Sequence, residues 1–164
     1  MSTTTAGNQL KTVISSRELL DHWQGHRALT RKVIEAFPEK EYFEYSIGGM
    51  RPFAAIVQEL LAIAAPGIRQ IVKGTKEELN EEVSGAGSRE KVMELWDRAT
   101  SEINELWPEI TDERFHETIM AFGMYEGTII STILYYIDNE IHHRGQGYVY
   151  LRSLGIEPPA FWNR

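Results

Sequence analysis

The sequence contains no cysteine, which limits both its redox chemistry and the metal sites that it can form. A disulfide framework, a thiolate nucleophile and a cysteine-based zinc site are therefore excluded. Basic residues are scarce relative to acidic ones, with 17 Lys and Arg against 24 Asp and Glu and a formal net charge of −7. Because a nucleic-acid backbone is recognised by a basic surface, we expect no nucleic acid among the partners.

Long hydrophobic runs are also missing. No apolar stretch approaches the ~20 residues that a bilayer-spanning helix requires, so we expect no membrane partner. Residues 1–8 are small and polar and lack the basic start and apolar segment of a signal peptide, which favours a cytoplasmic protein. The sequence has no nucleophile elbow, phosphate-binding glycine loop or dinucleotide fingerprint, and no nucleophilic catalyst is therefore visible.

The chain of 164 residues has the size of one compact domain. No internal repeat or low-complexity tract divides it. We predict a disordered polar tail over residues 1–14 and a single helical domain over residues 15–164.

Apolar residues at three- and four-residue spacing predict a first helix over residues 16–36. Ser15 and Glu18 match a capping box at its start. A second helix is predicted to begin at Pro52. It should kink or break early near Ala65, because the following proline removes an internal hydrogen bond.

The rest of the chain is predicted to be helices joined by connections. Residues 38–49 are expected to be a connection at a bundle end, and residues 74–87 a long charged connection between helices two and three. A third helix should follow Ser88 and end before Pro108. Periodicity does not decide between extended and irregular chain over residues 111–124. The last long helix starts near residue 129, and the fold class is all-α.

The most specific pattern lies in this last helix. His-His-Arg-Gly-Gln over residues 142–146 is followed by aromatic-x-x-Leu-Arg over residues 148–152, by Gly155 and by the prolines at 158 and 159. This pattern resembles the last helix of the DinB/YfiT-like family of metal-dependent proteins. The resemblance covers the chain from about Arg17 to its end, and it implies a DinB-like four-helix bundle, often dimeric, with a divalent metal held by three histidines.

The resemblance carries the family's three metal positions onto Glu59, Asn139 and His143. Only His143 keeps the histidine of the family pattern. A carboxylate, an amide and one imidazole form a weak set for a divalent metal. We therefore predict that Zn, Ni, Mn or Fe is held weakly at Glu59, Asn139 and His143, or is absent.

Two function classes follow from this altered site. One is a metal-dependent enzyme, of the hydrolase or thiol-dependent transferase type that the resemblance implies, acting on an unidentified small molecule. The alternative is a non-catalytic binding bundle whose metal site has degenerated. In both cases the resemblance implies a homodimer.

Glu59 has its own chemical requirements. Isoleucines three residues before it and four residues after it place its carboxylate on an apolar flank of the second helix. Burying an unpaired carboxylate is costly, so it needs a metal or a cation such as Arg51 or Arg144. Arg144 lies on the apolar stripe of the last helix, where we expect it either to form an ion pair, with Glu59 or Glu126, or to cap a backbone carbonyl.

A helical wheel places the polar residues of the last helix around its apolar stripe, which includes Ile141 and Arg144. Glu140 lies roughly 60° and His143 roughly 120° from the centre of the stripe, so both are predicted at the edge of the core. Asn139 lies further round.

Two other arrangements could hold a metal. His22 and His26 are four residues apart on the first helix, a spacing at which two imidazoles can share a metal. Otherwise His26 is a hydrogen-bonded core histidine. The Glu-x-x-His spacing used in di-iron bundles occurs at residues 140–143 and 113–116, and such short matches also arise by chance.

Overall fold

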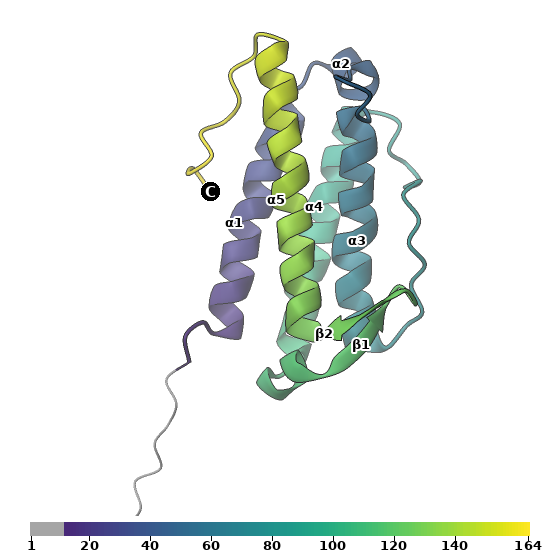
Figure 1. Ribbon diagram of the computed structural model, residues 1–164, viewed down its shortest axis with the longest axis vertical. Helices are drawn as coiled ribbons and strands as arrows, with labels where there is room; N and C mark the ends of the chain where they lie inside the picture. The colour runs from purple at the N-terminus through teal and green to yellow at the C-terminus, as the bar shows by residue number, and fades with distance from the viewer. Residues whose placement is uncertain (1–11) are drawn as a thin grey trace, which may run out of the picture.

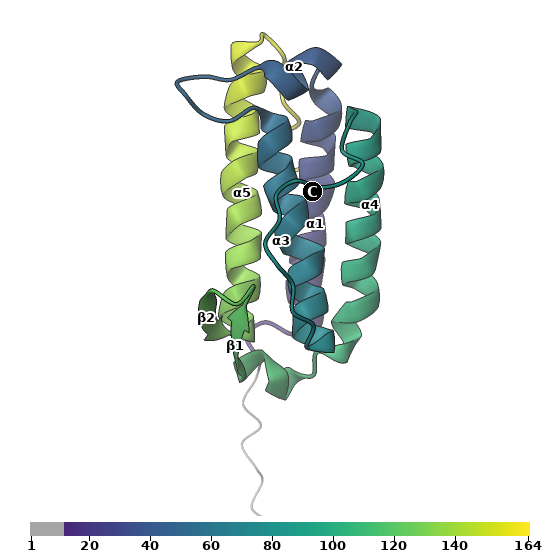
Figure 2. The same ribbon diagram turned by 90° about the vertical axis from the view of Figure 1, so that its right-hand side faces the viewer.

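The computed structural model describes residues 12–164 and is mostly helical. Four long helices run side by side along the length of the molecule (Figures 1 and 2). They are α1 (Ser16–Ala36), α3 (Phe53–Lys73), α4 (Arg89–Leu106) and α5 (Ile129–Ser153). Most of the predicted tail over residues 1–14 lies outside the described residues. Of the described part, Val13 is fully exposed.

Short elements close the two ends of these helices. They are helix α2 (Glu39–Glu44), the 3-10 helices η1 (Trp107–Glu109) and η2 (Asp112–His116), and strands β1 (Thr118–Ala121) and β2 (Tyr125–Thr128). The two strands form an antiparallel hairpin that leads directly into α5 (Figure 1).

Side-chain caps explain where α1 and α4 begin. The Ser15 side chain accepts a hydrogen bond from the backbone N–H of Glu18, and the Glu18 carboxylate accepts one from the backbone N–H of Ser15 at 2.8 Å, so the predicted capping box is confirmed. Ser88 accepts from the N–H of Lys91 and begins α4 as predicted. Each cap satisfies N–H groups that have no partner inside the first helical turn.

Of the kink or early break predicted near Ala65, the break is wrong, because helix α3 continues through Pro66 to Lys73. The residues after the proline explain this, because Ile68 and Ile71 are 0% and 2% exposed and their burial offsets one lost hydrogen bond. This helix is also long and apolar enough to cross a membrane, although we expected no such segment. Its most apolar window is 61% buried within the protein, as in a core helix.

The segment between α3 and α4 has no helix over residues 74–88. Polar contacts fasten it along α3. The N–H of Val83 donates to Oε1 of Gln58 at 3.1 Å, and Arg69 pairs with Glu77 at 3.2 Å.

Two short elements were not predicted. Helix α2 lies within the predicted connection 38–49 and buries Tyr42 against the end of α3. The hairpin begins within the segment 111–124, for which periodicity was indecisive, and its second strand follows that segment. Strands of four residues are too short to show a clear alternation of polar and apolar side chains.

The core consists of two apolar clusters at different heights along the helices. On α1, Trp23 belongs to one cluster and Val33 to the other; on α5, Ile133 and Leu151 are divided in the same way. Between them, buried polar side chains lie on α1 and α5. This polar layer supplies the charged groups described below.

Candidate functional site

Glu59 lies at the meeting point of the three positions that the family resemblance assigns to a metal. Asn139 Nδ2 donates to Oε1 of Glu59 at 3.3 Å, and Nε2 of His143 lies 3.0 Å from the same oxygen. The side chains of Glu59 and His143 are only 15% and 10% exposed. Helices α3 and α5 thus bring all three side chains together.

Arg51 completes this cluster from the turn that precedes α3. Its guanidinium forms an ion pair with Oε2 of Glu59 and a second one with Glu81 at 3.0 Å. Arg51 is therefore the cation that the sequence offered as an alternative to a metal. Arg144 faces α1, so its predicted pairing with Glu59 or Glu126 is wrong, whereas the alternative, contact with a backbone carbonyl, is confirmed at His26.

The environment of Glu59 keeps its carboxylate ionised. Burial alone would raise its pKa, but hydrogen bonds from Arg51, His143 and Asn139 and the attraction of His143 outweigh burial and hold the pKa below its usual range. Three side chains, Arg51, Asn139 and His143, therefore contact one carboxylate.

His143 is held at both ring nitrogens. A carboxylate only accepts hydrogen bonds, so Nε2 of His143 must carry the proton that it shares with Glu59. Nδ1 lies 2.8 Å from Oε1 of the Gln146 side chain, one turn further along α5. This arrangement fixes the ring but leaves Nε2 without a lone pair on the side of Glu59.

As arranged, these residues do not fit a divalent cation. A metal ligand must direct a lone pair at the ion, whereas both oxygens of Glu59 accept hydrogen bonds and Nε2 of His143 donates one. The guanidinium of Arg51 adds a positive charge at the place a cation would take. Among residues 12–164, no three His, Asp or Glu side chains form a group that could hold a metal ion.

A cavity of about 380 Å³ opens beside this cluster, with Glu59 in its wall. It lies between α3, the segment after α3, the hairpin and the start of α5. Its lining residues are mostly apolar or aromatic, with three carboxylates: Glu59, Ile63, Leu79, Glu81, Ala121, Phe122, Tyr125, Glu126, Gly127, Ser131, Thr132, Tyr135 and Tyr136.

The hairpin wall of this cavity is fastened to α3 by one side chain. Gln70 donates from Nε2 to the carbonyl of Met120 at 3.2 Å and accepts at Oε1 from the N–H of Phe122 at 2.9 Å. Phe122 has a φ of 53°, which is costly for an aromatic residue. Its buried ring packs against Tyr136, which offsets that cost. The wall is therefore positioned by the fold.

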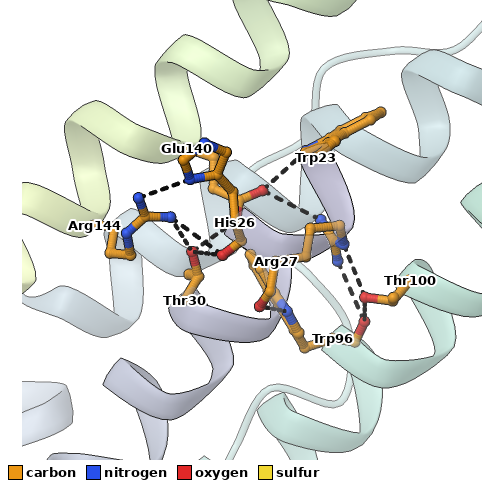
Figure 3. A network of polar contacts seen from close by, with 8 residues as sticks. All are labelled: Trp23, His26, Arg27, Thr30, Trp96, Thr100, Glu140 and Arg144. Carbon is orange, nitrogen blue, oxygen red and sulfur yellow. Dashed lines mark hydrogen bonds and ion pairs between the residues drawn. The ribbon is translucent and has the colours of Figure 1, made fainter. Parts of the chain in front are cut away.

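A second polar cluster lies on the α1 side of α5 and is more deeply buried (Figure 3). The Glu140 carboxylate accepts from Thr30 Oγ1 at 2.7 Å and from Trp23 Nε1 at 3.2 Å, and its Oε2 lies 3.6 Å from the Arg27 guanidinium. Glu140 is 2% exposed, so its prediction as an edge residue is wrong. Since Glu140 faces α1 and His143 contacts Glu59 on α3, they do not form a common metal site.

Arg27 neutralises this carboxylate and ties α1 to α4. It is fully buried, donates to Oγ1 of Thr100 at 2.8 Å and to the carbonyl of Trp96, and stacks 4.1 Å from the Trp96 ring centroid. Burial lowers the pKa of Arg27 and attraction by Glu140 raises it, yet a guanidinium stays charged in either case. Burial raises the pKa of Glu140, while Arg27 and the hydrogen bonds from Thr30 and Trp23 lower it, so these partners are what favour the ionised carboxylate in the core.

Arg144 extends the same cluster to the two histidines of α1. It donates to the carbonyl of His26 at 3.2 Å and to Nδ1 of the same residue at 3.0 Å, while Nε2 of His26 lies 3.2 Å from His22 (Figure 3 shows the contacts of Arg144). Burial, with repulsion from Arg144, His22 and Arg164, lowers the pKa of His26 to about 4. Two neighbouring guanidinium groups disfavour a metal at this pair.

The remaining Glu-x-x-His match also lies apart from the others. Glu113 and His116 belong to the 3-10 helix η2 and are both exposed. They share no polar contact with Glu140 or His143 within residues 12–164. The two Glu-x-x-His segments therefore do not come together as the paired motifs of a di-iron site do.

Sequence reasoning missed several residues that shape these sites. Arg27 follows Trp23 by one helical turn, so its place on the core side of α1 was visible from spacing. Glu81 and Gln70 gave no such signal, because their contacts depend on how a connection and a hairpin fold back onto α3.

The architecture is that of a mostly helical protein in which four long helices pack side by side. The model of the DinB family matches residues 1–163, and the chain belongs to the DinB family. No curated protein matches the chain.

Two solved structures share the fold. A DinB-like protein from Bacillus cereus has a TM-score of 0.72 and 16% sequence identity, and the match covers 88% of this chain and 95% of that one. A DinB-like protein from Bacillus subtilis, YjoA, has a TM-score of 0.71 and 18% identity over 90% of this chain and 99% of that one. At these identities the likeness concerns the fold.

Proposed function

We propose that this DinB-family four-helix bundle, with its charged connection between α3 and α4, is a non-catalytic binding protein for a small organic molecule. The ligand would occupy the cavity beside Glu59. The observation that carries the proposal is the Arg51–Glu59–His143 network, which engages the atoms that a metal would need and places a carboxylate in the cavity wall.

The metal-dependent enzyme remains the competing account. In it, Glu59, Asn139 and His143 would hold Zn, Ni, Mn or Fe, which would supply Lewis-acid chemistry for a hydrolase or a thiol-dependent transferase. Arg51 would have to leave Glu59, and His143 would have to give up its Nε2 proton. Both steps separate groups that stabilise each other in the fold.

We further propose a cytoplasmic homodimer. Several apolar side chains on the outer side of α5 support the dimer, namely Leu134, Tyr135, Ile141 and Val149, which are 37–58% exposed. A row of exposed apolar side chains along one helix is typical of an interaction surface. Light scattering of the purified protein at several concentrations would measure the assembly directly.

Metal content separates the two functional accounts. We expect protein purified without an affinity tag to contain substoichiometric metal and to show no thermal stabilisation by Zn²⁺ or Ni²⁺. The double variant Glu59→His and Asn139→His should gain stabilisation by metal, because a ligand that binds only the folded state raises its stability. Stoichiometric metal in the natural protein, lost in His143→Ala, would instead establish the metal account.

The stability and metal content of the single variant Glu59→Ala provide a second test. Under our proposal it destabilises the metal-free protein by about 1 kcal/mol, a modest figure because Arg51 is 44% exposed and solvent screens its charge. Under the metal account it lowers metal content and leaves the metal-free protein unchanged.

A further inference from the structure

The cavity beside Glu59 has walls of one charge sign. Glu59, Glu81 and Glu126 line it, and none of its lining residues within the described part of the chain is Lys, Arg or His. Arg51 neutralises at most one of the two carboxylates that it pairs with. Even with a positive charge on His143, the surroundings of the cavity remain net negative.

Glu126 is the carboxylate best placed to meet a ligand. It lies on β2 and forms no ion pair with any residue between 12 and 164. Glu59 and Glu81, in contrast, are already paired with Arg51. A cation entering the cavity would therefore gain the attraction of Glu126 without displacing an existing partner.

Aromatic side chains form much of the remaining wall. Phe122, Tyr125, Tyr135 and Tyr136 all line the cavity, and Tyr125 and Tyr135 are 60% and 58% exposed. The face of an aromatic ring attracts organic cations. The hairpin, fastened by Gln70, holds two of these rings opposite the start of α5.

Tyr136 contributes its aromatic ring to this wall. It is 4% exposed, and its hydroxyl oxygen forms no hydrogen bond with any residue in the described part of the chain. Buried hydroxyl groups in folded proteins normally have a partner. Here the hydroxyl lies against Gly67 on α3 and does not face the cavity, so a ligand would meet the ring of Tyr136 and not its oxygen.

We propose that the cavity binds a small organic cation, a protonated or quaternary amine with an aromatic or aliphatic body. This inference rests on the proposed binding function and names its ligand class. The volume of about 380 Å³ lies at the small end of the range for ligand pockets, which suits a compact amine. The carboxylates select the charge, while the aromatic walls take the body.

Three probes of nearly equal shape test this selection. They are 2-phenylethylammonium, the neutral 2-phenylethanol and the anionic 3-phenylpropanoate, each titrated into ¹⁵N-labelled full-length protein. We expect the cation to bind at least tenfold more tightly than the other two and to shift amide signals of the hairpin and the start of α5. Raising the salt concentration should weaken the binding of the cation alone.

Two matched variants assign the effect to the cavity. Glu126→Gln should lower the affinity for the cation severalfold and leave that for the neutral probe unchanged. Glu105→Gln removes an equally exposed carboxylate from α4, outside the cavity, and should change neither affinity. Equal losses in both variants would overturn the proposal, since net charge alone would then explain the binding.

The outcomes for the two proposals are distinct. If the neutral or anionic probe binds in the cavity as tightly as the cation, the ligand class is wrong and the binding function stands. If no probe binds and the protein carries stoichiometric metal at Glu59, the binding function itself fails. If no probe binds and no metal is present, the cation proposal is overturned.

Discussion

Replacing Glu140 with alanine should destabilise the protein by ~4 kcal/mol, because it would leave the Arg27 guanidinium in the core without an anion. The side chains of Arg27 and Glu140 are 0% and 2% exposed, so solvent cannot screen the remaining charge. The pair joins α1 to α5 within the polar layer between the two apolar clusters. Its loss should therefore affect the whole fold.

The other donors around the carboxylate would be affected unequally. Thr30 has a single hydroxyl proton and can turn it from Glu140 to the carbonyl of His26, 3.0 Å away. Trp23 Nε1–H has no second acceptor among residues 12–164 and would lose its hydrogen bond, a cost of ~1–3 kcal/mol that overlaps with the charge effect. Glu140→Gln keeps an acceptor oxygen but no charge, and its loss should be smaller than that of the alanine variant.

Urea unfolding followed by circular dichroism measures these changes as the free energy of unfolding, provided that the denaturant dependence stays constant. Glu105→Ala, at an exposed position on α4, should stay within ~0.5 kcal/mol of the natural protein. The double variant Arg27→Met and Glu140→Leu should recover most of the loss, since removing both charges leaves none unpaired. A loss below ~1 kcal/mol for Glu140→Ala, or no recovery in the double variant, would refute the charge-pairing argument.

Two further predictions concern pH and packing. Acidification from pH 6.5 to about 4 should lower the free energy of unfolding by ~2 kcal/mol, because His26 binds a proton in the unfolded state but, with a pKa of about 4, stays largely neutral in the folded state. His26→Gln should remove this part of the pH dependence. An unchanged pH profile in that variant would contradict the assignment to His26. Gly147→Ala should destabilise by ~1–2 kcal/mol, because its Cβ would lie 2.6 Å from the Phe53 ring. A Cβ at Gly145 meets no atom of residues 12–164 within 4 Å, so Gly145→Ala should stabilise α5 by up to ~1 kcal/mol. Thermal unfolding of both glycine variants provides the comparison, and equal effects would mean that Phe53 yields to the added methyl group.

Local signals predicted the long helices well because their ends depend on nearby residues. The capping box at Ser15 lies within one turn, and Gly155, with a φ of +76°, follows the end of α5 where the sequence placed it. At Pro66 the local signal failed, because the burial of residues beyond the proline determines whether the helix continues. That burial depends on tertiary contacts, which the local sequence does not show.

The candidate site was only partly accessible from sequence. The convergence of Glu59, Asn139 and His143 came from the family pattern, since the helical wheel had placed Asn139 away from the apolar stripe. The choice of partner for Glu59 depends on Arg51, which lies in a turn before α3. No periodicity predicts where the side chain of such a residue points. The sequence could therefore suggest the ion pair between Arg51 and Glu59 but could not favour it over Arg144 or a metal.

The position of Glu140 shows why an apolar stripe can misplace the core side of a helix. Counting apolar residues put Ile141 on the stripe, yet Ile141 is 37% exposed and Glu140 is 2% exposed. Helix α5 packs against both α1 and α3, so its buried arc is wider than one stripe and includes Glu140. A hydrophobicity pattern cannot identify a buried carboxylate, but a residue of opposite charge at the same level on the facing helix can. Arg27 occupies the core side of α1 at the level of Glu140, and a search for charges of opposite sign on facing helices would have identified the pair before its geometry was known.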